Sequence, residues 1–251
     1  MDMFDLTGKK AIVTGGVQGL AHAMAEGLME AGAEVCIIDM SPRTHEVAEE
    51  FNASGLKCHG TIADLSSQEV REDIVKKCID TMGGLDIIVN AAGIQRRHKS
   101  EEFPLSDWEA VININLTSVF SMCQLAARHF LKNDGGKIIN IASMLSFFGG
   151  YTVPAYAASK GGIAQITKAF ANEWASKRIN VNAIAPGYMD TAMNVALVND
   201  QDRNKEILMR IPANRWGKPS DMKGPVVFLA SSASDYLNGA IIPVDGGYLA
   251  R

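Results

Sequence analysis

Three side chains that can exchange protons stand close together in the second half of the chain: Ser143, Tyr156 and Lys160. Residues 135–142 are a short apolar run opened by glycines, which predicts a buried strand that delivers Ser143 at its carboxyl end. The apolar spacing of residues 155–174 predicts a helix. Tyr156 and Lys160, four residues apart, then share one face of that helix.

The spacing of Tyr156 and Lys160 has a chemical use. A phenol with a pKa near ~10 is ionised in only about one molecule in a thousand at pH 7, so it is a poor base without help. An ammonium about 4 Å away contributes roughly 4 kcal/mol at an effective dielectric constant of about 20, enough to lower the phenol pKa by about three units. Lys160 is therefore expected to make Tyr156 a working acid or base. The alternative for this pair alone is an amphipathic helix with a surface lysine and a core tyrosine.

A second candidate site lies near the amino end of the chain. Residues 10–13 predict a strand, and the glycine turn at residues 14–21 opens a helix that Gly32 ends. Glycines in such a turn let the backbone approach a pyrophosphate, whose charge is favoured by the free amides at the helix start. The predicted strand 34–38 ends in Asp39, where a carboxylate can accept hydrogen bonds from an adenosine ribose. The alternative for Asp39 is a cap on the helix that follows.

The composition fits one globular domain, because the chain has 251 residues, of which 47% are hydrophobic and 21% charged. The net charge of −4 and the dispersed basic residues exclude a basic footprint, so no nucleic-acid partner is expected. Cys36, Cys58, Cys78 and Cys123 lack a Cys-x-x-Cys spacing, which favours reduced thiols and no metal site. We find neither a signal peptide nor an apolar run of membrane-spanning length, so a cytoplasmic protein without membrane contact is expected.

Strand and helix signals alternate along the rest of the chain. The predicted helices cover residues 42–53, 106–132 and 219–230 and one that starts at Ser67; the predicted strands cover residues 57–62, 85–89, 179–185 and 240–244. Parallel strands joined by helices point their carboxyl ends one way, so the loops after these strands meet at one rim. The pattern predicts a single-domain α/β fold, with a doubly wound, Rossmann-like parallel sheet of seven strands and helices on both faces.

Some details of this pattern stay open. Residues 66–69 look like a capping box, and residues 106–109 are expected to cap the long helix. Asn113 and Asn115 fall inside that helix, where such a residue could kink it or hold a water. Residues 188–214 have no clean assignment and only weak helical spacing, so we expect a mobile lid over the substrate there.

Together these residues resemble the short-chain dehydrogenase/reductase family over the whole chain. The motifs that carry the resemblance are Thr14-Gly15-x-x-x-Gly19, Asp64-Leu65, Asn90-x-Ala92-Gly93, Asn115, Ser143, Tyr156-x-x-x-Lys160 and Pro186-Gly187. The family implies hydride exchange between a nicotinamide and a carbinol or carbonyl, with Tyr156 as acid and base and Ser143 polarising the substrate oxygen. It also implies that Lys160 lowers the Tyr156 pKa and holds the nicotinamide ribose, and that Asn115 keeps a water of the proton relay.

The resemblance also implies the cofactor contacts. Asp64 and Leu65 are expected to meet the adenine, and residues 90–93 to line the cofactor and steady the sheet. Asp39 favours NAD(H), because a carboxylate repels a 2′-phosphate, while Arg43 is the nearby cation that could receive one. The expected cofactor-binding residues are Gly15, Val17, Gln18, Gly19, Leu20, Asp39, Met40, Asp64, Leu65, Asn90, Ala92, Gly93, Tyr156, Lys160, Pro186, Gly187, Met189 and Thr191.

Two positions depart from the family pattern. Ala21 stands where the glycine turn usually has its last glycine, and its methyl group narrows the approach of helix and strand. Ala91 stands where a second asparagine is usual, so no side-chain amide is available to hydrogen-bond there. Neither position belongs to the expected catalytic group.

Three stretches, residues 140–150, 210–217 and 244–251, are similar to sugar-acid dehydrogenases. They resemble most the 2-dehydro-3-deoxy-D-gluconate 5-dehydrogenases, also called 2-deoxy-D-gluconate 3-dehydrogenases. That group implies NADH-dependent reduction of 2,5-diketo-3-deoxygluconate (3-deoxy-D-glycero-2,5-hexodiulosonate) to 2-keto-3-deoxygluconate, from uronates of pectin or glycosaminoglycans, and a homotetramer built on two long helices. Residues 93–98 are closer to gluconate 5-dehydrogenase, which is the alternative beside another short-chain carbonyl reductase.

Two arginines just past residue 93 invite an anion, because a guanidinium can grip a carboxylate with two parallel hydrogen bonds. Arg97, ahead of Arg96, is expected to orient the carboxylate of the sugar acid. The alternative is that both arginines pair with Glu101 and Glu102 or are solvated. The expected substrate-contacting residues are Gln95, Arg96, Arg97, Ser143, Met144 and Tyr188. A remote alternative of another class is a non-catalytic dinucleotide-binding protein, against which the four intact catalytic positions argue.

Overall fold

Seven parallel strands form one sheet in the order β3-β2-β1-β4-β5-β6-β7. The structure is a computed structural model that describes residues 3–251. The strands are β1 (Lys10–Thr14), β2 (Glu34–Asp39), β3 (Cys58–Ile62), β4 (Ile87–Asn90), β5 (Gly136–Ile141), β6 (Ile179–Pro186) and β7 (Ile241–Val244). The predicted doubly wound, Rossmann-like sheet is confirmed. The strand order reverses between β1 and β4, which is where ligands of such sheets bind.

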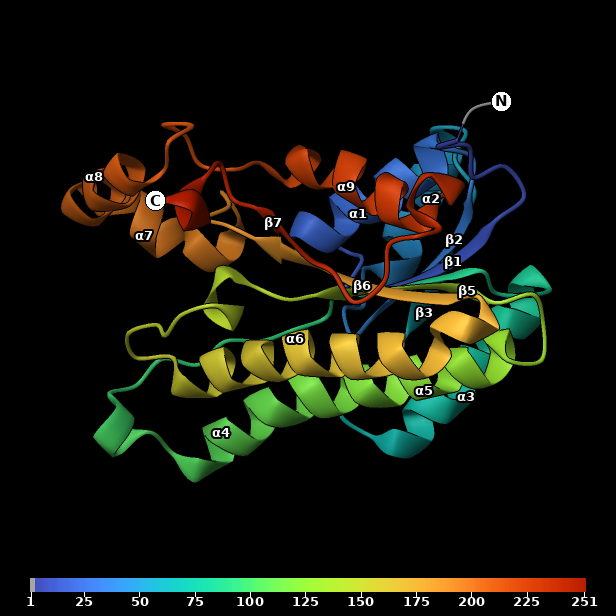
Figure 1. Ribbon diagram of the computed structural model, residues 1–251, viewed down its shortest axis with the longest axis horizontal. Coiled ribbons are helices and arrows are strands. Elements are labelled where there is room, and N and C mark those ends of the chain that lie inside the picture. Colours follow the sequence, from blue (N-terminus) through green and yellow to red (C-terminus); the bar gives the residue numbers. More distant parts are fainter. Residues whose placement is uncertain (1–2) are drawn as a thin grey trace.

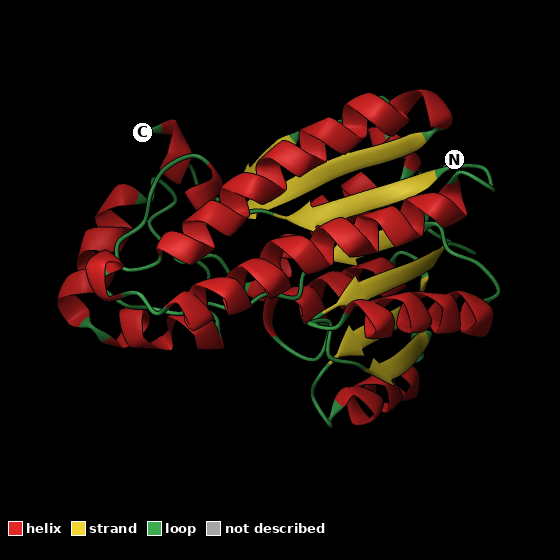
Figure 2. Ribbon diagram, turned by 90° about the horizontal axis from the view of Figure 1, so that it is seen from below, coloured by secondary structure: helices red, strands yellow, loops and turns green. Residues whose placement is uncertain are grey.

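Helices cover both faces of the sheet (Figure 1). One face carries α1 (Gly19–Glu30), α2 (Thr44–Ala53) and α9 (Lys223–Ala230), and the other carries α3 (Gln68–Met82), α4 (Leu105–Ile112), α5 (Ser118–Phe130) and α6 (Pro154–Trp174). Two further helices, α7 (Val195–Asn199) and α8 (Gln201–Arg210), lie past one end of the sheet. The strand arrows point toward that same end (Figure 2), so the carboxyl ends of the strands form a single rim there.

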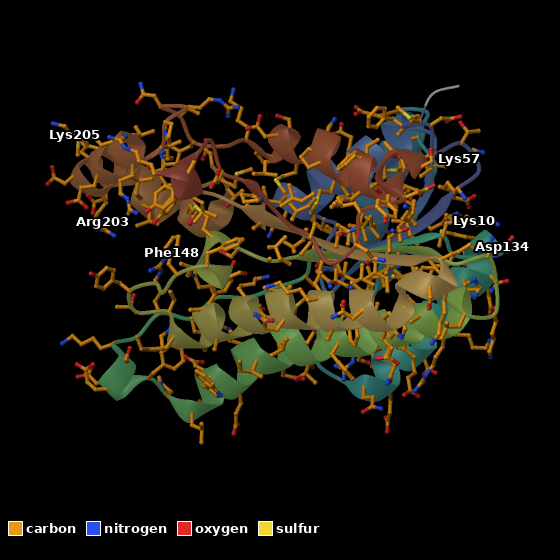
Figure 3. All side chains as sticks on the ribbon, viewed as in Figure 1. Lys10, Lys57, Asp134, Phe148, Arg203 and Lys205 are labelled. Carbon is orange, nitrogen blue, oxygen red and sulfur yellow. The ribbon has the colours of Figure 1, made fainter. Side chains whose placement is uncertain are left out.

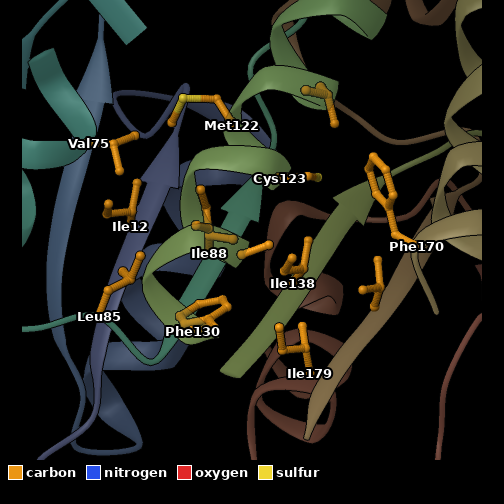
Figure 4. Packing of buried hydrophobic residues seen from close by; sticks show 14 of the residues in the cluster. Ile12, Val75, Leu85, Ile88, Met122, Cys123, Phe130, Ile138, Phe170 and Ile179 are labelled. Atoms are coloured by element: carbon orange, nitrogen blue, oxygen red, sulfur yellow. The ribbon is translucent and has the colours of Figure 1, made fainter. Parts of the chain in front are cut away.

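The core follows from the alternation of side chains along each strand. Ile12 packs toward α5 together with Ile88 and Ile138 (Figure 4), whereas its neighbours Ala11 and Val13 belong to the cluster on the opposite face. Each such side chain, when fully buried, contributes about 1.5–3 kcal/mol relative to an exposed one. Because both faces are filled in this way, β1, β2 and β4 read as nearly continuous apolar runs, whereas the edge strand β3 does not.

The helix that was predicted over residues 106–132 is interrupted by a π turn at Asn113–Thr117, between α4 and α5. It begins at Leu105 after Pro104, without a side-chain cap, so the predicted cap at residues 106–109 is wrong. The stretch Leu105–Phe130 is long and apolar enough, by length and composition, to cross a membrane, contrary to the expectation that no apolar run reaches this length. Its apolar residues have a different explanation, since Phe130 and others of its inner face are fully buried against the sheet.

Two other helix starts also differ in detail from the prediction. Helix α2 begins at Thr44, two residues later than expected, and Asp39 is not its cap. Helix α3 is capped by Ser67, whose hydroxyl accepts from the N–H of Val70 at 3.5 Å, so the box over residues 66–69 does not form.

The segment 188–214, which had no assignment, contains α7 and α8. Helix α8 is capped by the carboxylate of Asp200, which accepts from the N–H of Arg203 at 3.1 Å. Its helical pattern is weak in the sequence because Ile207 is its one buried residue. Ile207 and Ile211 join Met144 and Tyr248 in a small third core at the carboxyl rim.

Candidate active site

Ser143 stands at the carboxyl rim, two residues past the end of β5, as predicted. Its extended backbone starts a short 3-10 turn, Met144–Ser146, and its Oγ accepts from the N–H of Leu145 at 3.2 Å. Its hydroxyl also acts on the phenol of Tyr156, whose pKa it lowers. The serine is thus fixed by its own turn and aimed at the tyrosine.

Tyr156 and Lys160 lie one turn apart on α6, which begins with Pro154, a residue suited to a first helical turn. The Lys160 Nζ is 5.5 Å from the centre of the Tyr156 ring. It donates to the main-chain oxygen of Ile141, at the end of β5, over 2.6 Å. Since Lys160 is only 5% exposed, this bond holds its ammonium at the rim between helix and sheet.

The charge states differ from the expectation in one respect. Burial raises the pKa of Tyr156, and the hydrogen bond from Ser143 is the interaction that opposes this. Burial lowers the pKa of Lys160 to about 8. The predicted lowering of the Tyr156 pKa by Lys160 is not seen: Lys160 is not among the groups that shift this pKa, and its Nζ, which donates to the Ile141 oxygen, lies 5.5 Å from the centre of the Tyr156 ring. Ser143 is the side chain that favours the ionised phenol.

Asn115 joins this group from the π turn, where it is fully buried. Its Oδ1 accepts from the N–H of Ile94 at 2.8 Å, and its Nδ2 donates to the Ile94 oxygen at 2.9 Å and to Ser159 Oγ at 3.3 Å. A Cβ at Gly93 would lie 3.3 Å from Asn115 Oδ1 and 4.0 Å from Lys160 Nζ, so these three residues converge. π turns are frequent at functional sites. We call Ser143, Tyr156, Lys160 and Asn115 the catalytic rim.

The glycine turn lies at the same rim, after β1. Gly15 has a φ of 77°, and a Cβ on it would stand 3.0 Å from the Cα of Ala92; one on Gly16 would stand 2.7 Å from Ile37. Only glycine fits a cradle this close to neighbouring backbone. Gln18 provides no side-chain cap for α1, and the first turn has no acidic residue, so the helix amides stay available for an anion.

Asp39 ends β2 beside this turn. Its carboxylate accepts from the N–H of Val17 at 3.3 Å and from the N–H of Ser41 at 3.0 Å. Arg43 is engaged with two glutamates, 3.1 Å from Glu46 and 3.5 Å from Glu50. The acid is thus anchored by the backbone, and the nearby cation is already paired at the surface.

The other expected cofactor residues divide into two groups. Asp64, Gly187 and Thr191 lie in loops at the rim, as does the exposed Met40, whereas Pro186 ends β6 and Leu20 stands in the first turn of α1. Asn90 and Met189 are each 2% exposed, so their side chains face inward. The Asn90 amide donates to Asn140 Oδ1 at 2.9 Å, in a polar cluster that ties β4 to β5. The Asn90 side chain thus links two strands of the sheet, as expected. Because this side chain is buried, only the backbone of Asn90 could contact a cofactor.

The two arginines after Gly93 do not behave alike. Arg96 lies 3.6 Å from Asp107, which also pairs with His98 at 2.7 Å, whereas the predicted alternative partners Glu101 and Glu102 are not engaged with it. Among residues 3–251, no hydrogen-bond or ion-pair partner is found for the exposed Arg97. Asp107 was read as a helix cap in the sequence, and its role in holding this loop was missed.

Aromatic side chains border the rim on the other side. Tyr188 makes edge contacts with Trp216 at 5.5 Å and Tyr248 at 5.4 Å, and the Arg210 guanidinium lies 4.4 Å from the centre of the Tyr248 ring. Tyr248 packs with Met144, the buried neighbour of Ser143. We call Arg96, Arg97, Tyr188, Arg210 and Tyr248 the outer wall.

Ser146 is a further residue of the site, and the sequence did not predict a role for it. Its hydroxyl donates to the main-chain oxygen of Lys160 at 2.7 Å and accepts from the N–H of Ser143 at 3.3 Å. It therefore ties the turn of the catalytic serine to the helix of the catalytic lysine. The available signal was its position three residues past Ser143, at the end of the turn.

A hollow of about 1070 Å³ lies at the opposite rim, among the loops that enter the strands. Figure 3 shows two of its lining residues, Lys10 and Asp134, at the far end from Phe148 and Arg203. Several of its charged groups pair with each other, such as Arg178 with Asp134 at 2.6 Å. The hollow is thus separate from the catalytic rim.

Comparison with known proteins fits this site. The model of the short chain dehydrogenase family matches residues 9–202. The 2-dehydro-3-deoxy-D-gluconate 5-dehydrogenase of Dickeya dadantii is 52% identical over 253 residues, covering 100% of this chain and 99% of that protein. The gluconate 5-dehydrogenase of Gluconobacter oxydans is 38% identical, covering 98% of this chain and 96% of that protein.

Solved structures agree as well. A protein from Agrobacterium tumefaciens with bound NADP is 46% identical, with a TM-score of 0.94 and both chains fully covered. A gluconate 5-dehydrogenase from Burkholderia cenocepacia, in complex with NADP and tartrate, is 37% identical with a TM-score of 0.97, covering 100% of this chain and 98% of that one. The chain therefore belongs to the short-chain dehydrogenase family.

Proposed function

We propose that the protein is a nicotinamide-dependent oxidoreductase that interconverts a keto sugar acid and its hydroxy form. The observation that supports this most directly is the convergence of Ser143, Tyr156, Lys160 and Asn115 beside the glycine turn. A bound nicotinamide dinucleotide supplies the hydride chemistry. The close glycine cradle, the uncapped start of α1 and the Asp39 carboxylate are the features that fit such a group.

The residues of the catalytic rim divide the work of proton transfer. Tyr156 gives its proton to the carbonyl oxygen of the keto acid, and Ser143 donates a hydrogen bond to the same oxygen as charge develops on it. Lys160 binds the nicotinamide ribose and passes protons to Tyr156, for which a pKa of about 8 is suitable. Asn115 holds the loop at Ile94 through both of its amide atoms and, in this proposal, keeps the relay water.

We propose NAD(H) as the preferred cofactor. Two backbone N–H groups anchor Asp39, so the carboxylate cannot move away from a 2′-phosphate without losing both bonds. Arg43 is held by Glu46 and Glu50 and is a poor phosphate partner. The relatives solved with NADP make the measurement decisive: kcat/KM for NADH against NADPH in the wild type. A higher value for NADPH refutes this assignment.

The substrate we propose is 2,5-diketo-3-deoxygluconate (3-deoxy-D-glycero-2,5-hexodiulosonate), reduced to 2-keto-3-deoxygluconate in uronate catabolism. The names of the most similar relatives support it. Arg97, unpaired among the described residues, is proposed to grip the carboxylate, with Gln95, Met144 and Tyr188 completing the substrate side. Gluconate 5-dehydrogenase activity is the second candidate, favoured by the relatives of that name.

One assay separates these substrates. Oxidation of NADH is followed with 2,5-diketo-3-deoxygluconate, with 5-ketogluconate and with uncharged ketones at matched concentrations. The proposal expects the highest kcat/KM for the first compound. A higher value for 5-ketogluconate would select the second candidate, and equal values for uncharged ketones would remove sugar acids from consideration.

The remaining proposals concern assembly and setting. Exposed apolar residues on α4 and α5, Leu105, Trp108 and Phe120, support a homotetramer built on the long helices, which light scattering can test. Four free, buried cysteines fit a reducing cytoplasm.

Residues 188–214, with α7 and α8, are proposed to act as a lid over the substrate.

A further inference from the structure

Arg71 is a buried cation without a counter-ion. It lies in the first turn of α3 with 3% of its surface exposed, and no carboxylate pairs with it among residues 3–251. Its Nη1 donates to the main-chain oxygen of Leu65 at 2.6 Å, while its Nε has no hydrogen-bond partner. Burial lowers the pKa of Arg71, and the charge of the neighbouring Glu72, which forms no ion pair with it, opposes this shift. Because an unpaired buried charge typically costs several kcal/mol, its retention calls for a compensating gain.

The compensating gain is the fixed shape of the loop that Arg71 contacts, residues 63–67 between β3 and α3. This loop borders the end of β2, since the N–H of Ala63 donates to the Asp39 oxygen at 2.9 Å. The peptide group between Leu65 and Ser66 is bound at both ends: its oxygen by Arg71, and its N–H by Asp64 Oδ1 at 2.9 Å. Arg71 therefore fixes the rotation of this peptide and, through it, the direction of the Asp64 carboxylate.

A second side chain holds the next carbonyl of the same loop. Asn113, on the π turn, donates from Nδ2 to the Ser66 oxygen at 3.1 Å. The carbonyl groups of Leu65 and Ser66 thus accept hydrogen bonds from side chains of two different helical segments, Arg71 on α3 and Asn113 on the π turn. The second oxygen of Asp64 has no protein partner among residues 3–251 and faces solvent, so it remains available to accept from an amino group.

We infer that Arg71 and Asn113 are positioning residues that hold the loop Asp64–Ser66 in the shape that receives the adenine ring of the dinucleotide. The inference rests on the proposed function, because it takes the adenine to lie beside Asp64. Arg71 sets the orientation of the Leu65 peptide, Asn113 that of the Ser66 carbonyl, and Asp64 accepts from the exocyclic amine of the adenine. Neither positioning residue touches the reacting atoms.

The test measures binding of the two halves of the cofactor by calorimetry. In Arg71→Met, which keeps the length and removes the donors, affinity for NADH and for ADP-ribose is expected to fall at least tenfold. Affinity for reduced nicotinamide mononucleotide, which has no adenine, is expected to stay within twofold. Asn113→Ala is expected to show the same selectivity with about a threefold loss, because the bond it removes joins two neutral groups, whereas the bond from Arg71 is charge-assisted. Arg71→Lys, which can still reach the carbonyl, is expected to recover part of the affinity.

The matched control is Lys76→Met, which removes an exposed cation from the same helix. It is expected to leave all three affinities unchanged. The melting temperature of Arg71→Met is expected to be equal to or above that of the wild type, since a costly charge is gone. A lower melting temperature with equal losses for all three ligands would assign Arg71 a merely structural role and overturn the inference.

The same experiment separates the inference from the proposed function. Wild-type binding of ADP-ribose together with no turnover of any sugar acid would overturn the substrate proposal and leave the inference to be decided by the variants. No binding of NADH by the wild type would overturn both, and binding of NADH without any binding of ADP-ribose would overturn the inference alone. Unchanged ADP-ribose affinity in Arg71→Met and Asn113→Ala would overturn the inference alone.

Discussion

The catalytic rim and the outer wall both lie at the carboxyl end of the sheet, yet they are built in opposite ways. At the rim, Lys160 is 5% exposed and Asn115 is fully buried, and each polar group that could act is held by a protein partner. On the outer wall, no carboxylate pairs with Arg97 or Arg210 in the part of the chain that the structure describes. Buried, partnered groups determine which reaction is possible, whereas exposed, unpaired cations determine which molecule is accepted.

The first and largest expected effect is at the rim. Tyr156→Phe keeps the ring and removes the proton donor, so kcat is expected to fall by about a thousandfold or more. Affinity for NADH, measured by fluorescence titration, is expected to stay within about twofold of the wild type. Unchanged kcat would show that the rim does not perform the proton transfer and would remove the contrast between the two regions.

The next effect concerns stability rather than rate. The pKa of Lys160 is lowered from 10.5 to about 8, so folding penalises its protonated form. Below pH 8 both the folded and the unfolded chain carry the proton, and the folded state bears the whole penalty, about 3 kcal/mol. Between pH 8 and 10.5 the unfolded chain binds more protons, so this penalty disappears as the pH rises.

Lys160→Met does not titrate and removes this dependence. The free energy of unfolding of the wild type, minus that of Lys160→Met, is expected to rise by about 3 kcal/mol between pH 7.5 and 10.5 in urea titrations. All other groups titrate in both proteins and cancel in the difference. If the difference between the two free energies of unfolding did not change with pH, Lys160 would have its ordinary pKa. Its ammonium would then be more accessible to water than the structure indicates.

The third effect is on the outer wall. Arg97→Ala is expected to raise KM for the keto sugar acid about 10- to 100-fold, the usual loss for a charge-assisted pair, while KM for NADH stays unchanged. Arg96→Ala is the matched control, because Arg96 is already next to Asp107 and is expected to change KM much less. If Arg96→Ala had the larger effect, the assignment of the two arginines would be reversed.

Buried parts of the site could be predicted from the sequence, whereas backbone partners and exposed segments could not. The sheet, Ser143, and the pairing of Tyr156 with Lys160 follow from strand and helix periods that burial enforces on both sides. The partner of Lys160 was not predictable, because the Ile141 carbonyl is a backbone group whose position depends on how α6 packs against β5. Helix α8 was missed because Ile207 is its one buried residue, so the apolar period is weak, and α7 was missed because it is only five residues long.

The smallest predicted effect tests the residue that joins serine and lysine at the rim. Ser146 lies half buried and bridges the Ser143 N–H and the Lys160 oxygen, so Ser146→Ala removes two hydrogen bonds without touching the substrate. We expect kcat to fall about fivefold, in proportion to roughly 1 kcal/mol, and KM for NADH to stay the same. The hydrogen bond from Ser143 lowers the pKa of Tyr156, so a loosened serine turn should also raise the pKa seen in the basic limb of the oxidation rate profile.

Ser146→Thr restores the hydroxyl and is expected to recover both kcat and the pH profile. Ser106→Ala, an exposed serine on α4, serves as the control for removal of a surface hydroxyl. A purely structural serine would lower the melting temperature in Ser146→Ala without moving the pH profile. That outcome would place Ser146 with the general packing of α6, and it would mean that Leu145, whose N–H donates to Ser143 Oγ, suffices to fix the catalytic serine.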